Sequence, residues 1–296
     1  MKNFSYTKNK KAFFIFSAIC VLLGIICLCV FKVNWDVDFV GGTEMNIRVN
    51  TDDKNVQSEI EKIAKDIVKD KFSSVTSVSD STGRSILIKT NEIDSETRES
   101  IMTTISEKYG AENVILNSSN SVSGAISDSL RKSAILAISL AVVLMLAYIA
   151  IRFKPLSAVA AIVCLLHDIF FILVAYSILQ LPVNSNIIAV ALTILGYSIN
   201  ATIVIFDRIR ENNKIMSSQL SFEEKADYSV KQTIRRSIFT TITTLLTIGL
   251  IYILGVQSIK EFALPLIIGI ISGLYSSVFL AGSLWTTFKE KGNKVR

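Results

Sequence analysis

The sequence predicts an α-helical membrane protein with six transmembrane helices and an α+β domain between the first two of them. Half of the 296 residues are hydrophobic and the mean hydropathy is +0.48, although 19% of the residues are charged. The apolar residues gather in long runs, whereas a soluble chain of this length would distribute them among amphipathic elements. A helix needs about 20 predominantly apolar residues to cross the hydrocarbon core. These runs therefore predict membrane-spanning helices.

Six runs have the length that a span requires. They cover residues 12–31, 133–151, 156–179, 187–206, 237–256 and 262–288. Five of them contain no charged residue, and the third carries His167 and Asp168. The first run follows several lysines, as in a signal peptide, but it is about 20 residues long and lacks a small-x-small cleavage site. We interpret it as an uncleaved anchor.

The distribution of lysine and arginine predicts the orientation of the spans. Four of these residues lie in segment 1–11, two in the turn 152–154, seven in the loop 207–236 and four in the tail 289–296. The short loops on the opposite side carry only Lys260. Because cytoplasmic loops are enriched in Lys and Arg, both termini and the basic loop are predicted to be cytoplasmic. The remaining large segment, 32–132, is then extracytoplasmic.

Charge and motif content exclude several classes of function. Residues 32–132 hold 13 basic and 17 acidic residues, so the net charge of +6 reflects membrane topology and no nucleic-acid partner is expected. All four cysteines lie inside apolar runs, so no disulfide framework is predicted. The chain has no GxxxxGK phosphate-binding loop, and we see no nucleophile–base arrangement or metal-ligand cluster in segment 32–132. We therefore expect neither an enzyme nor a cofactor or metal.

The segment after the first span is predicted to form a small α+β domain. Alternating apolar side chains indicate a half-buried strand, and apolar spacings of three and four indicate an amphipathic helix. The predicted elements are a strand at 45–49, a helix beginning near Asp53, strands at 72–78 and 85–89 joined by the turn STGR, a helix at 95–109 and a strand at 112–117. The order β-α-β-β-α-β is that of the ferredoxin-like fold, which by itself implies no function.

Asp168 is the most informative polar residue, because it lies near the middle of the third span. A charged side chain at mid-bilayer costs about 2.5–3.5 kcal/mol on insertion scales, which favours a functional role such as ion or proton coupling. The alternative is a structural carboxyl group hydrogen-bonded to a neighbouring helix. His167, the only histidine, is adjacent, and a 100° step around the helix predicts that the two side chains point in different directions.

The fourth span carries a stripe of polar or small residues. Asn200 lies one turn after Gly196 and two turns from Thr193 and Asp207, so the four share one helix face. Such a stripe is typical of a hydrogen-bonded seam against another helix, and it can also line a proton path. Both interpretations stay open.

The fifth and sixth spans add two further features. Arg235 and Arg236 begin the fifth span, either as topology anchors or with one of them reaching inward to a carboxylate. The sixth span repeats small residues every four positions, which predicts close helix packing. These residues are Gly269, Gly273, Ser277 and Ala281.

Five motifs, spread over nearly the whole chain, resemble the SecD/SecF family of the RND superfamily. They are WDVDFVGGTEM at 35–45, LLHDIF at 165–170, GYSINATIVIFDRIREN at 196–212, QTIRRSIFTTITTLL at 232–246 and FALPLIIGIISGLYSSVFLA at 262–281. The resemblance implies an RND-type six-helix half-transporter that pairs with SecD and assists the SecYEG channel, with YidC as a further partner. It also implies that the proton-motive force helps to move preproteins on the outer side of the bacterial inner membrane.

The sequence departs from the family pattern at Ala201. In the family, an acid linked to proton passage usually follows the asparagine, and the arginine that matches Arg236 lies near it. An alanine cannot carry a proton, so the resemblance leaves an alternative, a non-energised scaffold that links SecD to the channel. A small-molecule RND exporter half is a weaker alternative, because such exporters usually carry both halves in one chain.

Overall fold

The computed structural model describes residues 5–51, 53, 55–80 and 83–294. The ends of the two predicted terminal segments, and residues 81–82 of the predicted hairpin turn, lie outside this range. The chain divides into two compact units. The helical unit contains Met1–Asn34 and Ile135–Arg296, and the α+β unit contains Trp35–Ala134.

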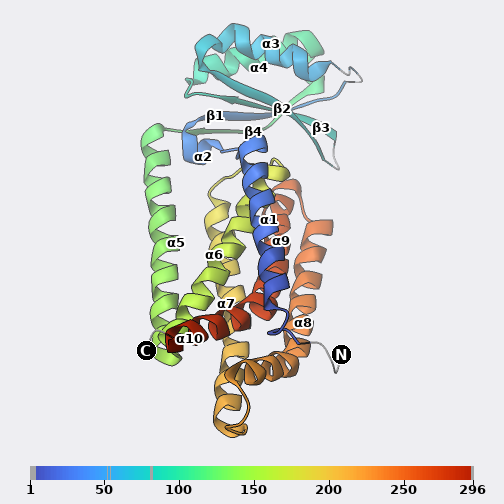
Figure 1. The fold of residues 1–296 in the computed structure, drawn as a ribbon. Coiled ribbons are helices and arrows are strands. Elements are labelled where there is room, and N and C mark those ends of the chain that lie inside the picture. The colour runs from blue at the N-terminus through green and yellow to red at the C-terminus, as the bar shows by residue number, and fades with distance from the viewer. Residues whose placement is uncertain (1–4, 52, 54, 81–82, 295–296) are drawn as a thin grey trace. The chain divides into compact units, whose positions relative to one another are not determined.

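Six helices among the described residues are long and apolar enough to cross a membrane (Figure 1). They are α1 (Lys10–Phe31), α5 (Gly124–Arg152), α6 (Pro155–Ile178), α7 (Asn186–Ile215), α8 (Phe222–Leu254) and the continuous run of α9 (Gln257–Tyr275), the π-helical segment η3 (Ser276–Ala281) and α10 (Gly282–Lys294). Their number and order match the six predicted spans.

The helices extend well beyond the predicted apolar spans, and most of the predicted loop 207–236 is helical. Helix α7 continues to Ile215 and α8 begins at Phe222, so only six residues separate them. A capping box explains the early start of α8, because the Ser221 side chain accepts from the Glu224 backbone N–H while Glu224 bonds back to Ser221. Hydropathy identifies the part of a helix that fits the membrane and gives no information on its polar ends.

Helices α6 and α9–α10 form the centre of the helical unit. About half of their apolar windows is buried, 50% and 56%, whereas α1, α5 and α8 are buried over only 6% to 11%. Small side chains allow close packing around α6. Gly24 of α1, for example, leaves room for the ring of Phe170 and for Val174. The outer helices therefore keep broad apolar faces for lipid or for another chain.

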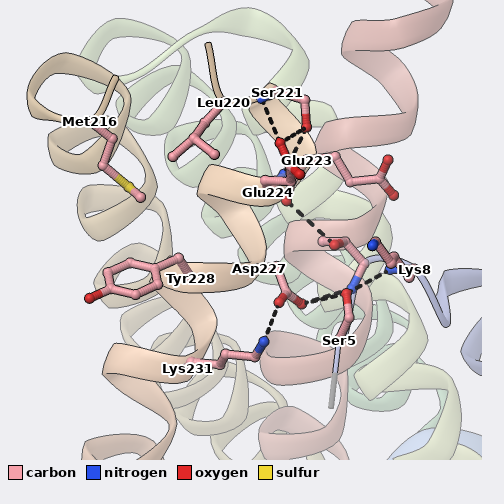
Figure 2. Close-up of a pocket in the computed structure, with 11 residues that line it drawn as sticks. Ser5, Lys8, Met216, Leu220, Ser221, Glu223, Glu224, Asp227, Tyr228 and Lys231 are labelled. Carbon is pink, nitrogen blue, oxygen red and sulfur yellow. Dashed lines mark hydrogen bonds and ion pairs between the residues drawn. The ribbon is translucent and has the colours of Figure 1, made fainter. Parts of the chain in front are cut away.

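The N-terminal segment is tied to the start of α8 beside a cavity of about 630 Å³ (Figure 2). The buried carboxyl group of Asp227 accepts hydrogen bonds from the backbone N–H groups of Tyr6 and Thr7 and from the Ser5 hydroxyl. Its other oxygen lies 2.6 Å from the Lys231 ammonium. The entry into α1 is thereby fixed to a helix more than 200 residues away in the sequence.

The α+β unit is a four-stranded antiparallel sheet with two helices on one face (Figure 1). Its elements are α2 (Val37–Val40), β1 (Gly42–Val49), α3 (Val56–Val68), β2 (Phe72–Asp80), β3 (Gly83–Thr90), α4 (Ser95–Tyr109) and β4 (Val114–Val122). The strand order is β2-β3-β1-β4, and every neighbouring pair is antiparallel. Alternate residues of β1, such as Met45 and Ile47, pack against α3 and α4 and form the core.

The opposite face of β1 carries a charged cluster. The Lys89 ammonium lies 3.0 Å from Asp36 Oδ1 and 3.5 Å from Glu44 Oε2. Burial and the neighbouring Asp36 raise the pKa of Glu44 to about 8, although Lys89 opposes the shift. Burial also disfavours ionisation of Asp36, but its hydrogen bond with Glu44 and the Lys89 ammonium together lower the pKa of Asp36. Near neutral pH Glu44 therefore holds the proton, and Asp36 is the ionised carboxyl group beside Lys89.

Candidate functional site: a carboxyl group enclosed by serines

Asp168 occupies the interior of the helical unit. It lies midway along α6, which begins with Pro155 at its first position and continues as an almost wholly apolar helix. The residue is fully buried, at 0% exposure. Because α6 is central, the Asp168 side chain reaches both α7 and the α9–η3 helix, and the hydrogen bonds come from those two elements.

Three serine hydroxyls donate to the two oxygens of Asp168. Ser198 of α7 lies 2.6 Å from Oδ2, and Ser276 of η3 lies 2.8 Å from the same oxygen. Ser272 of α9 lies 2.7 Å from Oδ1. A carboxylate has about four lone-pair sites, so most of its acceptor capacity is used. This cage offsets the cost of burying a polar group in a membrane-spanning segment.

His167 contributes the fourth group at this carboxyl. Its Nδ1 lies 3.3 Å from Asp168 Oδ1, so the two adjacent side chains turn toward each other despite the 100° step that predicted divergence. The ring packs against Phe171 and Tyr275, with centroid separations of 4.6 and 6.0 Å. Its buried Nε2 has no hydrogen-bond partner in the described part of the chain. Within the described residues, the contact with Asp168 is therefore the one polar contact of the imidazole.

The π-helical segment η3 extends the polar contacts away from Asp168. The Ser277 hydroxyl donates to the backbone oxygen of Ser198 at 3.2 Å and lies 2.9 Å from the Thr202 hydroxyl. A π-helical insertion changes the helical register, so the consecutive residues Ser276 and Ser277 both meet α7 or α6. Asp168, Ser276, Ser198, Ser277 and Thr202 form a buried polar line between helices that are otherwise apolar.

The small residues of the sixth span lie against α7. A side chain on Gly269 would overlap Ile194, and a Cβ on Gly273 would lie 3.2 Å from Ser198 Cβ. Ser277 contacts Ser198 and Thr202 as described, and Ala281 is fully buried. The same α9–η3 stretch carries Ser272 and Ser276, which donate to Asp168.

The predicted stripe of α7 lies on the other side of that helix. Thr193, Gly196 and Asn200 are exposed, while Ser198 faces Asp168. Within the described residues, the Asn200 amide has no hydrogen-bond partner. Its neighbour Ala201 is half-buried. Among the described residues, Asn200 thus makes no hydrogen bond to another helix, and the stripe does not line the Asp168 cage.

Asp207 and Arg236 are also absent from the cage. Asp207 lies 3.4 Å from both Arg152 and Arg210 and forms an ion-pair cluster at the helix ends. Arg236 is exposed on α8, and no ion pair links it to another described residue. Of the polar candidates in the sequence, the structure therefore brings together only Asp168 and His167.

The serines of the cage were not among the predicted site residues. Ser272 and Ser276 are spaced by four positions in an apolar helix, which was a usable signal for a polar face. Ser198 lies within the motif that contains Asn200 but about 160° around the helix from it. The sequence alone did not show which of these two faces meets Asp168.

The chain is similar to known proteins over nearly its whole length. The family model for the protein export membrane protein SecD/SecF, C-terminal, matches residues 101–291. The SecF subunit of Acidaminococcus fermentans is 36% identical over 296 residues, which cover 98% of this chain and 99% of that one. The SecDF subunit of Bacillus subtilis is 34% identical over 98% of this chain, but the match spans only 39% of the relative. The crystal structure of SecDF from Thermus thermophilus matches with a TM-score of 0.83 and 29% identity, over 97% of this chain and 39% of that one.

Proposed function

We propose, since the chain belongs to the SecD/SecF family of protein export membrane proteins, that it is a SecF subunit that couples the proton-motive force to preprotein export. The family and the six apolar helices make it a multi-pass membrane protein of protein translocation. The coupling step is the further claim, and it rests on the buried cage around Asp168. The membrane is proposed to be the bacterial inner membrane.

The cage has the properties that a proton-carrying group requires. Each serine hydroxyl can donate to a carboxylate or accept from a protonated acid, so Asp168 keeps its hydrogen bonds in both protonation states. His167 supplies a second group that can hold the proton. A charge that crosses the membrane field gains about 2.3 kcal/mol per 100 mV, which is sufficient to bias a two-state movement. We infer that protonation of Asp168 changes the packing of α6 against α7 and η3.

The exposed face of α7 supports a SecD partner. An unsatisfied amide in a membrane-spanning helix is costly, so Asn200 requires a polar partner outside this chain. The fused SecDF relatives are much longer than this chain, which spans only 39% of them. We propose that the remaining part of such proteins corresponds to the SecD half, and that a separate SecD covers Thr193, Gly196 and Asn200 here. An acid of that partner then takes the place that Ala201 leaves vacant.

The α+β unit is proposed to be a ferredoxin-like extracytoplasmic domain that handles the preprotein. The strand order β2-β3-β1-β4 with two helices on one face supports this fold. Lys and Arg are concentrated in segments 1–11, 152–154, 207–236 and 289–296, and this distribution supports cytoplasmic termini. SecYEG, together with YidC, is the proposed site at which the SecD–SecF pair acts.

The test uses inverted membrane vesicles that contain a stalled preprotein and SecD with either wild-type SecF or a variant. We expect Asp168→Asn to abolish the gradient-driven completion of translocation while the ATP-driven step continues. Asp207→Asn is the matched control, because it removes an acid at the helix ends and leaves the cage intact. If Asp168→Asn completes translocation with the same gradient dependence as wild type, Asp168 is not the coupling group.

The second candidate function is a non-energised scaffold between SecD and the channel, which Ala201 favours. The discriminating variant is Ala201→Asp. A rise in gradient-dependent completion would show that an ionisable group at this position restores coupling. A scaffold predicts no gradient response from either Ala201→Asp or Asp168→Asn, provided that both variants still copurify with SecD.

A further inference from the structure

A basic cavity of about 300 Å³ lies at the ends of four helices in the helical unit. Lys154 precedes α6, Arg210 and Lys214 belong to the last turns of α7, and Lys289 lies in α10. None of the side chains that line it in the described part of the chain is acidic. The cavity therefore concentrates four cations in a small volume.

Most of this positive charge has no counterion. Arg210 lies 3.4 Å from Asp207, but no ion pair links Lys154, Lys214 or Lys289 to any residue that the structure describes. Lys225, which is only 6% exposed, lies close enough to act electrostatically on Lys289, and so does Lys154. The positive charges of these neighbouring lysines repel one another. An anion in the cavity would relieve that repulsion.

Aromatic rings line the cavity beside its cations. Trp285 is buried and packs edge-on against Phe206 and Phe222, with centroids 4.9 and 5.3 Å apart. The Lys289 ammonium lies 3.4 Å from the centroid of the Phe222 ring. Trp and other amphipathic side chains are typical of the level of lipid headgroups. The rings and the cations therefore meet where the apolar part of the bundle ends.

We propose that this cavity binds the phosphate of an anionic phospholipid such as phosphatidylglycerol. Lysines bind phosphate as point charges, and basic pockets between transmembrane helices are known to take anionic headgroups. Ile151 and Leu156 precede and follow Lys154 in the sequence, and both side chains are exposed. They provide apolar surface for the acyl chains of the lipid. This apolar surface favours a lipid over a soluble phosphate compound.

The larger cavity beside the N-terminal segment does not fit the same ligand (Figure 2). It is lined by Glu223, Glu224 and Asp227 as well as by two lysines. Lys231 is already paired with Asp227. The three acidic side chains of this larger cavity would repel a phosphate. The basic cavity, which has no acidic residue in its described lining, is therefore the better site for an anion.

The test measures lipid bound to the full-length protein. Wild type and the double variant Lys154→Gln/Lys289→Gln are taken from nanodiscs of equal phosphatidylglycerol and phosphatidylcholine into mild detergent, and the bound lipids are counted by native mass spectrometry. We expect the double variant to lose affinity for phosphatidylglycerol by about fivefold per lysine, or about 25-fold in total. Lys8→Gln/Lys11→Gln is the charge-matched control from exposed positions near the same end of the bundle, and it should bind as wild type does.

Two further arms keep the outcome decisive. Lys154→Arg/Lys289→Arg should retain the lipid, which separates loss of charge from damage to the fold. Inorganic phosphate is added as a competitor. Three outcomes would each overturn the proposal. The two Gln double variants could retain the same amount of phosphatidylglycerol, wild type could retain as much phosphatidylcholine as phosphatidylglycerol, or millimolar phosphate could displace the bound lipid.

Discussion

Removing the Ser276 hydroxyl tests whether Asp168 carries a charge in its cage. Ser276 donates to Asp168 Oδ2 at 2.8 Å, and Ser276→Ala deletes one of three O–H donors without adding volume. A hydrogen bond to a charged group is worth about 1.5–3 kcal/mol, whereas one to a neutral group is worth about 0.5–1.5 kcal/mol. If the resting state is a carboxylate, the variant should therefore lose about 2 kcal/mol of stability.

The same loss should appear in transport, because the missing donor stabilises the ionised form. The hydrogen bond to a carboxylate exceeds that to the neutral acid by about 1 kcal/mol, so its loss lowers the ratio of carboxylate to carboxylic acid by about fivefold. We expect gradient-driven completion of translocation in membrane vesicles to slow by about that factor. Unfolding of the full-length protein in detergent, followed by circular dichroism, gives the stability.

Ser237→Ala is the matched control for this measurement. Ser237 is a buried serine whose hydroxyl has no hydrogen-bond partner among the described residues, so its loss should be neutral or slightly stabilising. If Ser276→Ala and Ser237→Ala behave alike in both assays, the cage does not support an ionised Asp168, and the coupling argument loses its physical basis.

Three other predictions concern packing, pH and the N-terminal segment. Gly269→Val should destabilise the bundle by about 1–3 kcal/mol, seen as a lower thermal midpoint, because the new side chain overlaps Ile194. The pKa of Glu44 is raised from 4.5 to about 8, so its stabilising contribution is complete below about pH 4.5 and is lost as the pH rises through 8. At the steepest point the free energy of unfolding falls by about 1.4 kcal/mol per pH unit. Hydrogen exchange in β1, corrected for the intrinsic rate, should accelerate over that interval in wild type and not in Glu44→Gln. Asp227→Ala removes the carboxyl group that accepts from the backbone N–H groups of Tyr6 and Thr7, so the N-terminal segment should become more sensitive to protease, and unchanged cleavage would contradict the role of Asp227 as its anchor.

Hydropathy and periodicity were sufficient for the architecture but not for the element ends. Six apolar runs gave six helices, and the order of strands and helices between residues 42 and 122 follows the predicted order. The early start of α8 depends on the capping box at Ser221, outside any apolar run. Likewise, α5 begins at Gly124, in a polar stretch that hydropathy excluded from the span. The membrane determines which residues must be apolar, and local capping determines where a helix ends.

The sequence identified the central residue of the site and not its partners. Asp168 stood out because a carboxyl group in an apolar run is costly wherever it points. Its donors depend on which helices meet α6, and that is a tertiary property. Ser272 and Ser276 donate to the carboxyl from a helix that also packs closely on α7 at Gly269 and Gly273. A periodic pattern within one helix cannot specify such a contact between two others.

Helix α7 shows why one polar stripe was not enough to locate the site. It carries polar residues on two faces, with Ser198 and Thr202 directed to the buried line and Asn200 exposed on the other side. Both faces lie in an apolar environment, so both must be satisfied. Asp168 and Ser277 satisfy the inner face from within the chain, whereas no described residue satisfies Asn200. This unsatisfied amide is the observation behind the proposal that a second chain covers the outer face. A helix polar on both faces is well placed to transmit a change in the packing around Asp168 to that partner.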